Sequence, residues 1–343
     1  MDKIRFAVVG LGIGILHIEG ILKNEDAELI ALCDTNEEKL NDNAQKYNVP
    51  VICTDYRELL LRDDIDAVCV TTPDHLHRDM VVDFLKAGKH VLCEKPLALN
   101  ADDCNAMIDA SDSSGAILMV GQVCRMTPSF AYAKKLIDEG EIGDLIFVES
   151  EYAHDYSHMK NSWRKSFEHP RHPFTGGGCH AVDLLRWIAG NPTEVYGITN
   201  KKVLKDWPCD DSAICVMKFP DDVMGKVFIS TGCKRNYTMR TALYGTKGTI
   251  ITDNTSSTVS LFKEEFCGET KAFGRTLENV EMKLSIEVNN HNVPKETDEF
   301  CDVILGRQEL KLSGREGAST VAVCEAVIAS AASGMPQKVK YPQ

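Results

Sequence analysis

Short apolar runs alternate with amphipathic stretches through the first third of the chain. The runs have the length of strands and few polar residues, which is typical of a sheet covered on both faces. They predict strands at residues 4–9, 28–33, 51–53, 66–71, 90–93 and 116–120. The stretches between them have helical spacing and predict helices at 15–23, 56–61, 78–87 and 101–113. This alternation predicts a parallel, doubly wound sheet.

The pattern changes after residue 122. Strands without intervening helices are predicted at 144–152, 195–199, 212–219, 225–232, 239–245 and 249–252. Helices are predicted at 128–139, 179–188, 295–305 and 316–332. Runs of consecutive strands favour a largely antiparallel sheet. We therefore expect an α/β protein with two domains, residues 1–122 and residues 123–343.

Composition excludes several classes of function. A net charge of -13 over 343 residues argues against nucleic acid or an anionic membrane as a partner. No apolar run approaches the roughly 20 residues that span a bilayer. The 13 cysteines are scattered singly without a Cys-x-x-Cys pair, so they read as buried thiols of a reducing compartment. A cytoplasmic protein is expected.

A glycine-rich turn links the first strand to the first helix. Gly10 permits the tight turn, Gly12 allows close approach of a pyrophosphate, and the helix start after Ile13 and Gly14 offers free N–H groups. The usual third glycine would fall one place after Gly14. The next strand ends in Asp34, which suits ribose hydroxyls and repels a 2′-phosphate, so NAD is favoured over NADP. The competing interpretation is a βαβ unit without nucleotide.

Two further strand ends carry polar groups on the edge where α/β sheets bind ligands. The strand at 90–93 is followed by Glu94 and Lys95, and a proline comes directly after them. The strand at 66–71 is followed by a turn that contains Thr72, Pro73, His75 and His77. We expect cofactor contacts from these residues. The alternatives are a surface Glu-Lys pair and histidines that only cap a helix start.

With these residues in place, the chain resembles a known family over essentially its whole length. The chain resembles the Gfo/Idh/MocA family, named for glucose-fructose oxidoreductase and inositol dehydrogenase. The likeness rests on the glycine turn with His17, Thr72-Pro73 with His77, residues 87–97 around Glu94-Lys95-Pro96, Gly140 to Gly143, Trp163-Arg164, Gly178 to Trp187, and Gly245 to Gly248. It implies a Rossmann domain that binds NAD or NADP and a substrate domain whose open sheet often forms an oligomer interface. It also implies a sugar or polyol substrate.

The resemblance also implies the catalytic residues. The lysine that matches Lys95 touches substrate and nicotinamide, and the histidine that matches His180 accepts the proton. An imidazole suits that task, and an ammonium stabilises a developing alkoxide. One position departs from the family: many relatives carry an Asp four residues before this histidine, where this chain has Gly176. The glycines at 176–178 predict a flexible approach to the helix. Asp183 is either an orienting partner or a residue that faces the N-terminal domain.

The segment from Tyr152 to His172 is polar, aromatic and rich in histidine. We expect substrate contacts from Tyr152, Trp163 and Arg164, joined by Cys179, His180 and Asp183. A solvated loop is the competing interpretation. A metal site is an alternative for His154, His158, His172 and His180, but their spacing matches no dedicated site, so none is assigned.

The sequence thus predicts an NAD-dependent dehydrogenase that oxidises a secondary hydroxyl of a sugar, inositol or glycoside. One alternative is a glycosidase or lyase that works through transient oxidation without net redox, to which the absent Asp gives weight. Another is a non-catalytic, regulatory NAD-binding subunit, which Lys95 and His180 argue against. A homodimer or homotetramer through the C-terminal sheet is expected.

Overall fold

The computed structural model describes residues 3–159, 162–263, 270–271, 274–275 and 281–342. The chain forms two compact units. The first contains residues 1–123, 292–321 and 341–343, and the second contains residues 124–291 and 322–340. Residues 292–321 therefore pack with the N-terminal unit, although they follow the C-terminal sheet in sequence. No described helix is long and apolar enough to cross a membrane.

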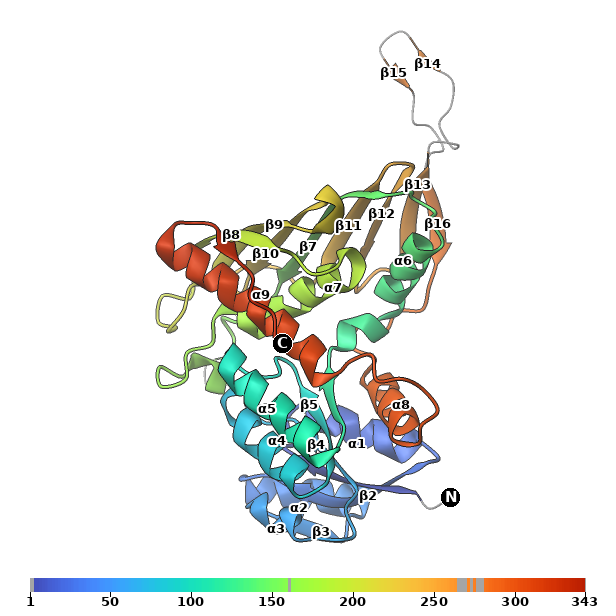
Figure 1. Cartoon of the computed structure of the whole chain (residues 1–343). Coiled ribbons are helices and arrows are strands. Elements are labelled where there is room, and N and C mark those ends of the chain that lie inside the picture. Colours follow the sequence, from blue (N-terminus) through green and yellow to red (C-terminus); the bar gives the residue numbers. More distant parts are fainter. Residues whose placement is uncertain (1–2, 160–161, 264–269, 272–273, 276–280, 343) are drawn as a thin grey trace. The chain divides into compact units, whose positions relative to one another are not determined.

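The first unit is built on a six-stranded parallel sheet in the order β3-β2-β1-β4-β5-β6 (Figure 1). Its strands are β1 (Ile4–Val9), β2 (Ala27–Cys33), β3 (Val51–Cys53), β4 (Ala67–Val70), β5 (His90–Glu94) and β6 (Leu118–Gly121). The helices between them are α1 (Gly14–Lys23), α2 (Glu37–Tyr47), α3 (Arg57–Leu60), α4 (His77–Lys86) and α5 (Ala101–Ser114). The predicted doubly wound sheet is confirmed. Helix α2 was not predicted.

Both faces of this sheet are covered. On one face, α4 and α5 pack onto the sheet through Phe84, Leu85 and Met107, all fully buried. On the other face, α1 packs against α8 (Val293–Ile304), and the ring of Phe300 meets Phe6 edge-on at 6.1 Å between centroids. Helix α8 therefore completes the N-terminal core. Helix α9 (Gly314–Ser333) begins in the same unit and continues into the second.

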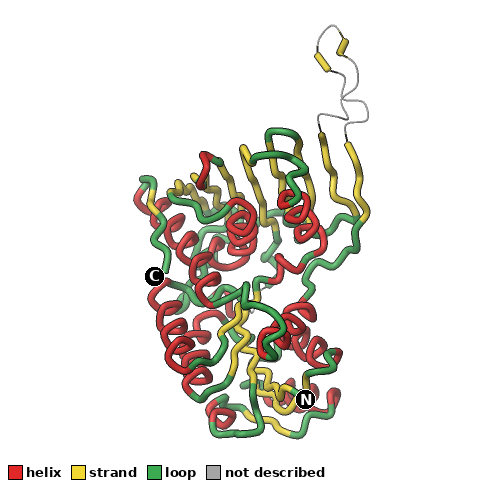
Figure 2. Tube along the Cα trace, turned by 45° about the vertical axis from the view of Figure 1, so that its right-hand side comes forward, coloured by secondary structure: helices red, strands yellow, loops and turns green. Residues whose placement is uncertain are grey.

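The second unit contains a nine-stranded sheet in the order β16-β13-β12-β11-β7-β10-β9-β8-β17. Its strands are drawn in yellow in Figure 2. Its strands are β7 (Leu145–Ala153), β8 (Glu194–Asn200), β9 (Ser212–Lys218), β10 (Met224–Ser230), β11 (Arg240–Gly245), β12 (Gly248–Asp253), β13 (Thr258–Lys263), β16 (Glu281–Ser285) and β17 (Gln337–Lys338). Among these described strands only the β7–β10 pair is parallel, so the predicted mainly antiparallel sheet is confirmed. The short strands β14 (Thr270–Lys271) and β15 (Gly274–Arg275) pair separately.

One face of this sheet is covered by helices α6 (Pro128–Asp138) and α7 (Cys179–Ala189) and by the end of α9 (Figure 1). Side chains alternate along the strands, so Ala213 and Cys215 of β9 are buried while Ile214 and Val216 are exposed. Ile214 lies opposite the exposed Ile198 of β8. The other face is therefore apolar and uncovered at these strands.

Candidate functional site

The first unit places the glycine turn between β1 and α1. Gly10 has a φ of +91°, and a Cβ there would lie 2.8 Å from the carbonyl oxygen of Thr71. Gly14 is the first residue of α1, and a Cβ on it would lie 2.6 Å from Thr71 Oγ1 and 2.9 Å from Val8 Cγ1. Gly14 therefore provides the close strand–helix contact that a third glycine usually provides one position later. A Cβ on Gly12 would meet nothing within 4 Å.

Asp34 lies directly after β2 and contacts this turn. Its Oδ2 accepts a hydrogen bond of 2.7 Å from the backbone N–H of Leu11, and its Oδ1 accepts one of 2.9 Å from Asn36. The Nζ of Lys39 lies 3.8 Å from Oδ2. The carboxylate is thus fixed beside the glycine turn, where it suits ribose hydroxyls.

Lys95 follows β5, and the residue before it is anchored in a buried cluster. The Oε1 of Glu94 lies 3.1 Å from His17 Nε2, and its Oε2 accepts a bond of 3.2 Å from the Lys95 N–H. Burial would raise the pKa of Glu94, but the His17 hydrogen bond and the charges of His17 and Lys95 outweigh it, so the pKa is lowered. Glu94 therefore stays ionised and fixes the backbone that presents Lys95.

Glu296 of α8 completes this cluster. Its side chain is fully buried, and neither carboxyl oxygen has a hydrogen-bond partner among the described residues. Burial, and then the nearby charge of Glu94, raise the pKa of Glu296 well above its usual value. The pair therefore holds one ionised and one protonated carboxyl group.

The turn after β4 is tied to the loop after Lys95 by His77. This ring is fully buried; its Nδ1 lies 3.0 Å from the Pro96 carbonyl and its Nε2 lies 3.0 Å from the Thr72 carbonyl. Thr72 Oγ1 contacts Met80 Sδ at 3.6 Å. His77 therefore acts as a brace between two loops at the sheet edge, while Pro73 and His75 lie in the same turn.

The second unit places His180 in the first turn of α7. Its Nδ1 lies 3.2 Å from the Sγ of Cys124. Its ring stacks on Tyr152 at 6.2 Å and on His291 at 5.7 Å between centroids. His180 is thus held among a thiol, a phenol and a second imidazole, with no carboxylate at position 176.

The three glycines before α7 are closely surrounded by side chains. They form a buried π-helical turn at 174–178, and a Cβ on Gly177 or Gly178 would collide with the side chain of Tyr152 or Ile229. A Cβ on Gly176 would lie 2.8 Å from Nη1 of Arg171. The expected flexible approach is therefore wrong: the turn is closely packed, and a guanidinium occupies the space beside Gly176.

An aromatic and polar group surrounds the His180 ring. The hydroxyl of Tyr152 lies 3.1 Å from His154 Nδ1 and 3.0 Å from the hydroxyl of Tyr156. Burial raises the pKa of Tyr152 well above its usual value, so the phenol stays neutral. A hollow of about 460 Å³ opens beside this group and is lined by His154, Asp155, His158, Lys234, Arg235, Asn236 and Tyr237. Its size suits a small ligand.

Three other predicted substrate residues have partners inside the second unit. The guanidinium groups of Arg164 and Arg171 lie 4.6 and 5.1 Å from the ring centre of Trp163. The thiol of Cys179 donates a hydrogen bond of 3.1 Å to the Gly176 carbonyl, which closes the turn onto the helix.

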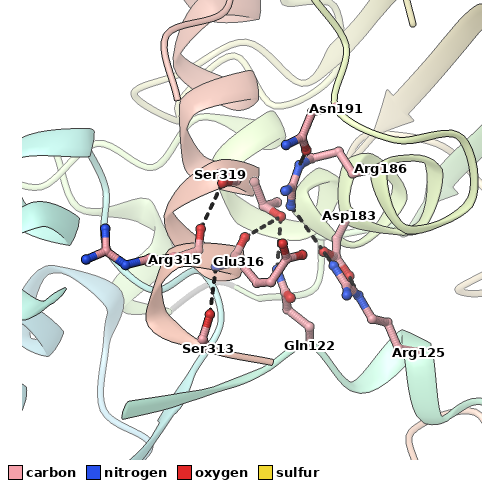
Figure 3. Close-up of polar contacts among 10 residues, drawn as sticks. Gln122, Arg125, Asp183, Arg186, Asn191, Ser313, Arg315, Glu316 and Ser319 are labelled. Atoms are coloured by element: carbon pink, nitrogen blue, oxygen red, sulfur yellow. Dashed lines mark hydrogen bonds and ion pairs between the residues drawn. The ribbon is translucent and has the colours of Figure 1, made fainter. Parts of the chain in front are cut away.

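Asp183 belongs to a buried ion network (Figure 3). Arg125 donates to it through Nε at 2.9 Å and Nη2 at 2.6 Å, and Arg186 Nη1 lies 3.7 Å away. Arg186 also donates to Asn191 at 2.9 Å. Asp183 therefore forms ion pairs with two arginines. In the first unit, Gln122 makes a separate 2.9 Å hydrogen bond to Thr320.

Sequence reasoning missed Cys124, His291 and Tyr237, because they are far from His180 in the chain and belong to no motif. Tyr237 contacts the Nε2 of His291 at 3.4 Å. Among the described residues, the metal-ligating atoms of Cys124, His180 and His291 lie within 4.8 Å of one another, as do those of His17, Glu94 and Glu296. The four histidines considered for a metal from the sequence do not form either group.

Comparison with known proteins gives two family matches. Residues 4–122 match a family described as an oxidoreductase family with an NAD-binding Rossmann fold. Residues 130–251 match the GFO/IDH/MocA C-terminal domain.

Individual relatives and structures agree with these matches. The chain is 30% identical to myo-inositol 2-dehydrogenase of Thermotoga maritima, covering 76% of this chain and 78% of the relative. It is 27% identical to inositol 2-dehydrogenase of Rhizobium meliloti, covering 96% and 97%. The structure of a levoglucosan dehydrogenase with NADH and L-sorbose superposes with a TM-score of 0.88 over 100% of both chains. At 21% identity this last likeness shows the fold.

Proposed function

We propose that this chain, which belongs to the GFO/IDH/MocA oxidoreductase family with its NAD-binding Rossmann fold, is an NAD-dependent dehydrogenase that oxidises a secondary hydroxyl of a sugar, inositol or glycoside. The names of its relatives support this class of substrate, since they include a myo-inositol 2-dehydrogenase and a levoglucosan dehydrogenase. The observation that supports this proposal most is that one unit contains both the dinucleotide-binding glycine turn and Lys95, whose backbone N–H is bound by Glu94. Such a lysine is suited to stabilise the alkoxide that develops as hydride leaves.

The glycine turn and Asp34 support NAD as the cofactor. The turn, with Gly10, Gly12, Ile13 and Gly14, would hold the pyrophosphate at the start of α1, and Asp34 would accept from the ribose hydroxyls. A 2′-phosphate would meet the Asp34 carboxylate, which is unfavourable for NADP. Glu94 accepts a hydrogen bond from the backbone N–H of Lys95. The same edge of the sheet also carries the turn with Thr72, Pro73, His75 and His77.

The chemical step assigns one task to each catalytic residue. Bound NAD would supply the hydride acceptor, and His180 would take the hydroxyl proton as the carbonyl forms. Lys95 stabilises negative charge on the oxygen during this step. Tyr152, Trp163 and Arg164 are proposed substrate contacts, because aromatic faces and planar donors suit a sugar. Cys179 and Asp183 shape the site through the contacts they make inside the second unit.

One experiment separates this proposal from its competitors. The purified protein is incubated with NAD and a panel of polyols, sugars and glycosides, and NADH absorbance and released sugar are followed together. Net NADH with an intact carbon skeleton supports the dehydrogenase. Sugar release without net NADH favours transient oxidation, and no change in either favours a regulatory subunit.

We also propose a homo-oligomer formed through the uncovered face of the nine-stranded sheet. Ile198, Ile214 and Val216 are exposed on neighbouring strands there. An apolar face of this kind is typical of an interface between subunits. A cytoplasmic location is supported by the twelve described cysteines, all of which are free thiols.

A further inference from the structure

Three side chains with metal-ligating atoms meet at the start of α7. Cys124 lies in the short 3₁₀ turn Val123–Met126, His180 in the first turn of α7, and His291 just before α8. Their ligand atoms all lie within 4.8 Å of one another, and Cys124 Sγ is 3.2 Å from His180 Nδ1. Bonds of about 2.3 Å to sulfur and about 2.0 Å to nitrogen hold the ligand atoms of a tetrahedral zinc ion roughly 3.5 Å apart. One ion can therefore contact all three side chains with little rearrangement.

The chemistry of this donor set selects the kind of metal. A thiolate with two imidazoles suits zinc, whereas magnesium and calcium prefer oxygen ligands. All three residues belong to the second unit, so the group is complete within it. Three protein ligands leave the fourth position of a tetrahedral ion for a water molecule.

The group lies next to the hollow of the second unit. Cys124 and His180 are buried, whereas His291 is only half-buried. The hydroxyl of Tyr237 lies 3.4 Å from His291 Nε2, and Tyr237 also lines the hollow of about 460 Å³. The hollow therefore gives an ion a route from solvent to the His291 side of the group.

The other group of metal-ligating atoms, His17 with Glu94 and Glu296, is less suited to a metal. His17 Nε2 already lies 3.1 Å from Glu94 Oε1. Burial and the charge of Glu94 raise the pKa of Glu296, so Glu296 carries a proton where a metal would need a carboxylate. We therefore assign no metal to that group.

We propose that Cys124, His180 and His291 bind one Zn²⁺ ion, and that this ion inhibits the dehydrogenase. The inhibition rests on the proposed function, in which His180 accepts the hydroxyl proton. On binding, the Cys124 S–H bond breaks, its proton passes to solvent, and the sulfur electron pair forms the bond to zinc. A neutral imidazole has a lone pair on one ring nitrogen and a hydrogen on the other. Zinc takes the lone pair of His180, so the ring has no place left for the proton of the substrate.

Metal binding is measured first, on the chelator-treated full chain with Zn²⁺ or Co²⁺ as the only added ion. The wild type should bind one equivalent of either ion, and Co²⁺ should show the near-ultraviolet absorption band of a thiolate ligand. Cys124→Ala and His291→Ala should each weaken Zn²⁺ binding at least about 100-fold, because loss of an outer-shell partner alone costs roughly 10- to 100-fold. Cys215→Ala removes a buried thiol of β9 and is the matched control, which should keep the stoichiometry and the band. His17→Gln should keep both as well, because the other group is not the site.

Inhibition is measured next, with a substrate that yields NADH. Saturating Zn²⁺ should slow NADH formation on the order of 100-fold, the contribution of a general base, and a chelator should restore the rate. Absence of binding, a Co²⁺ complex without the thiolate band, or unchanged affinity in both Cys124→Ala and His291→Ala would overturn the metal site. Bound zinc with an unchanged rate, or a protein that is active only with zinc, would overturn the inhibition. If no substrate of the panel yields NADH but zinc binds with the predicted ligands, the proposed function fails and the metal site stands.

Discussion

The buried carboxyl group of Glu296 makes a quantitative prediction. It is enclosed between α8 and the sheet of the first unit, and a Cβ on Gly121 would lie 3.5 Å from its Oε2. Burial and the ionised Glu94 raise its pKa, so the folded state keeps a proton that the unfolded chain gives up near pH 4.5. Glu296→Gln replaces the protonated acid with a neutral amide of the same shape.

The sign follows from proton binding. Above the unfolded pKa, the folded wild type binds more protons than the unfolded chain, so its stability falls as pH rises toward the folded pKa. Each pH unit in this window costs the wild type up to about 1.4 kcal/mol, a cost that the glutamine variant does not have. Below pH 4 the two proteins should be about equally stable, and above it the variant should gain steadily over the wild type.

Urea unfolding at intervals between pH 4 and pH 8, followed by fluorescence, measures this difference. Glu309→Gln, at an exposed position, is the control and should show no such trend. Parallel stability curves for the wild type and Glu296→Gln would refute the reasoning, because they would mean that Glu296 is ionised in the folded protein.

Three further predictions address the cofactor turn, the ion network and the oligomer. Asp34→Ser should raise the KM for NAD about 10-fold or more while kcat changes little, and should narrow the preference for NAD over NADP, measured in parallel assays. Arg125→Ala should destabilise the protein by about 3–5 kcal/mol because it removes the bidentate partner of the buried Asp183, and adding Asp183→Asn should recover much of that loss in urea unfolding. Val216→Asp should shift the proposed oligomer to monomers in sedimentation, and an unchanged mass would show that this sheet face is not the interface.

The fold was largely predictable because the apolar pattern of each strand is local. Strands β1 to β6 lie within a few residues of their predicted positions. Most of their residues are apolar, and β4, β5 and β6 are almost wholly buried. Helix α2 was missed because it is almost entirely polar and buries only Leu40 and Asn43. The packing of α8 with the N-terminal unit could not be read from its own periodicity, because it depends on tertiary contacts such as Phe6 with Phe300.

Residues of the candidate site could be predicted from the sequence only where they belong to a recognisable motif. Lys95, Asp34 and His180 stand at motif positions, whereas Cys124 and His291 reach His180 only through folding. The absent carboxylate at 176 was visible in the sequence. The contact of His180 with Cys124 was not, since these residues lie 56 positions apart in the chain.

The central claim is that this protein moves a hydride from a secondary alcohol to NAD with Lys95 at the reacting oxygen. The most direct measurement follows deuterium from the carbinol carbons of labelled polyols and sugars into the cofactor by mass spectrometry. The account predicts NADH one mass unit heavier with the wild type, and loss of the transfer in Lys95→Ala while NAD binding is retained. Cofactor free of deuterium with every substrate in the panel, or full transfer in Lys95→Ala, would contradict it.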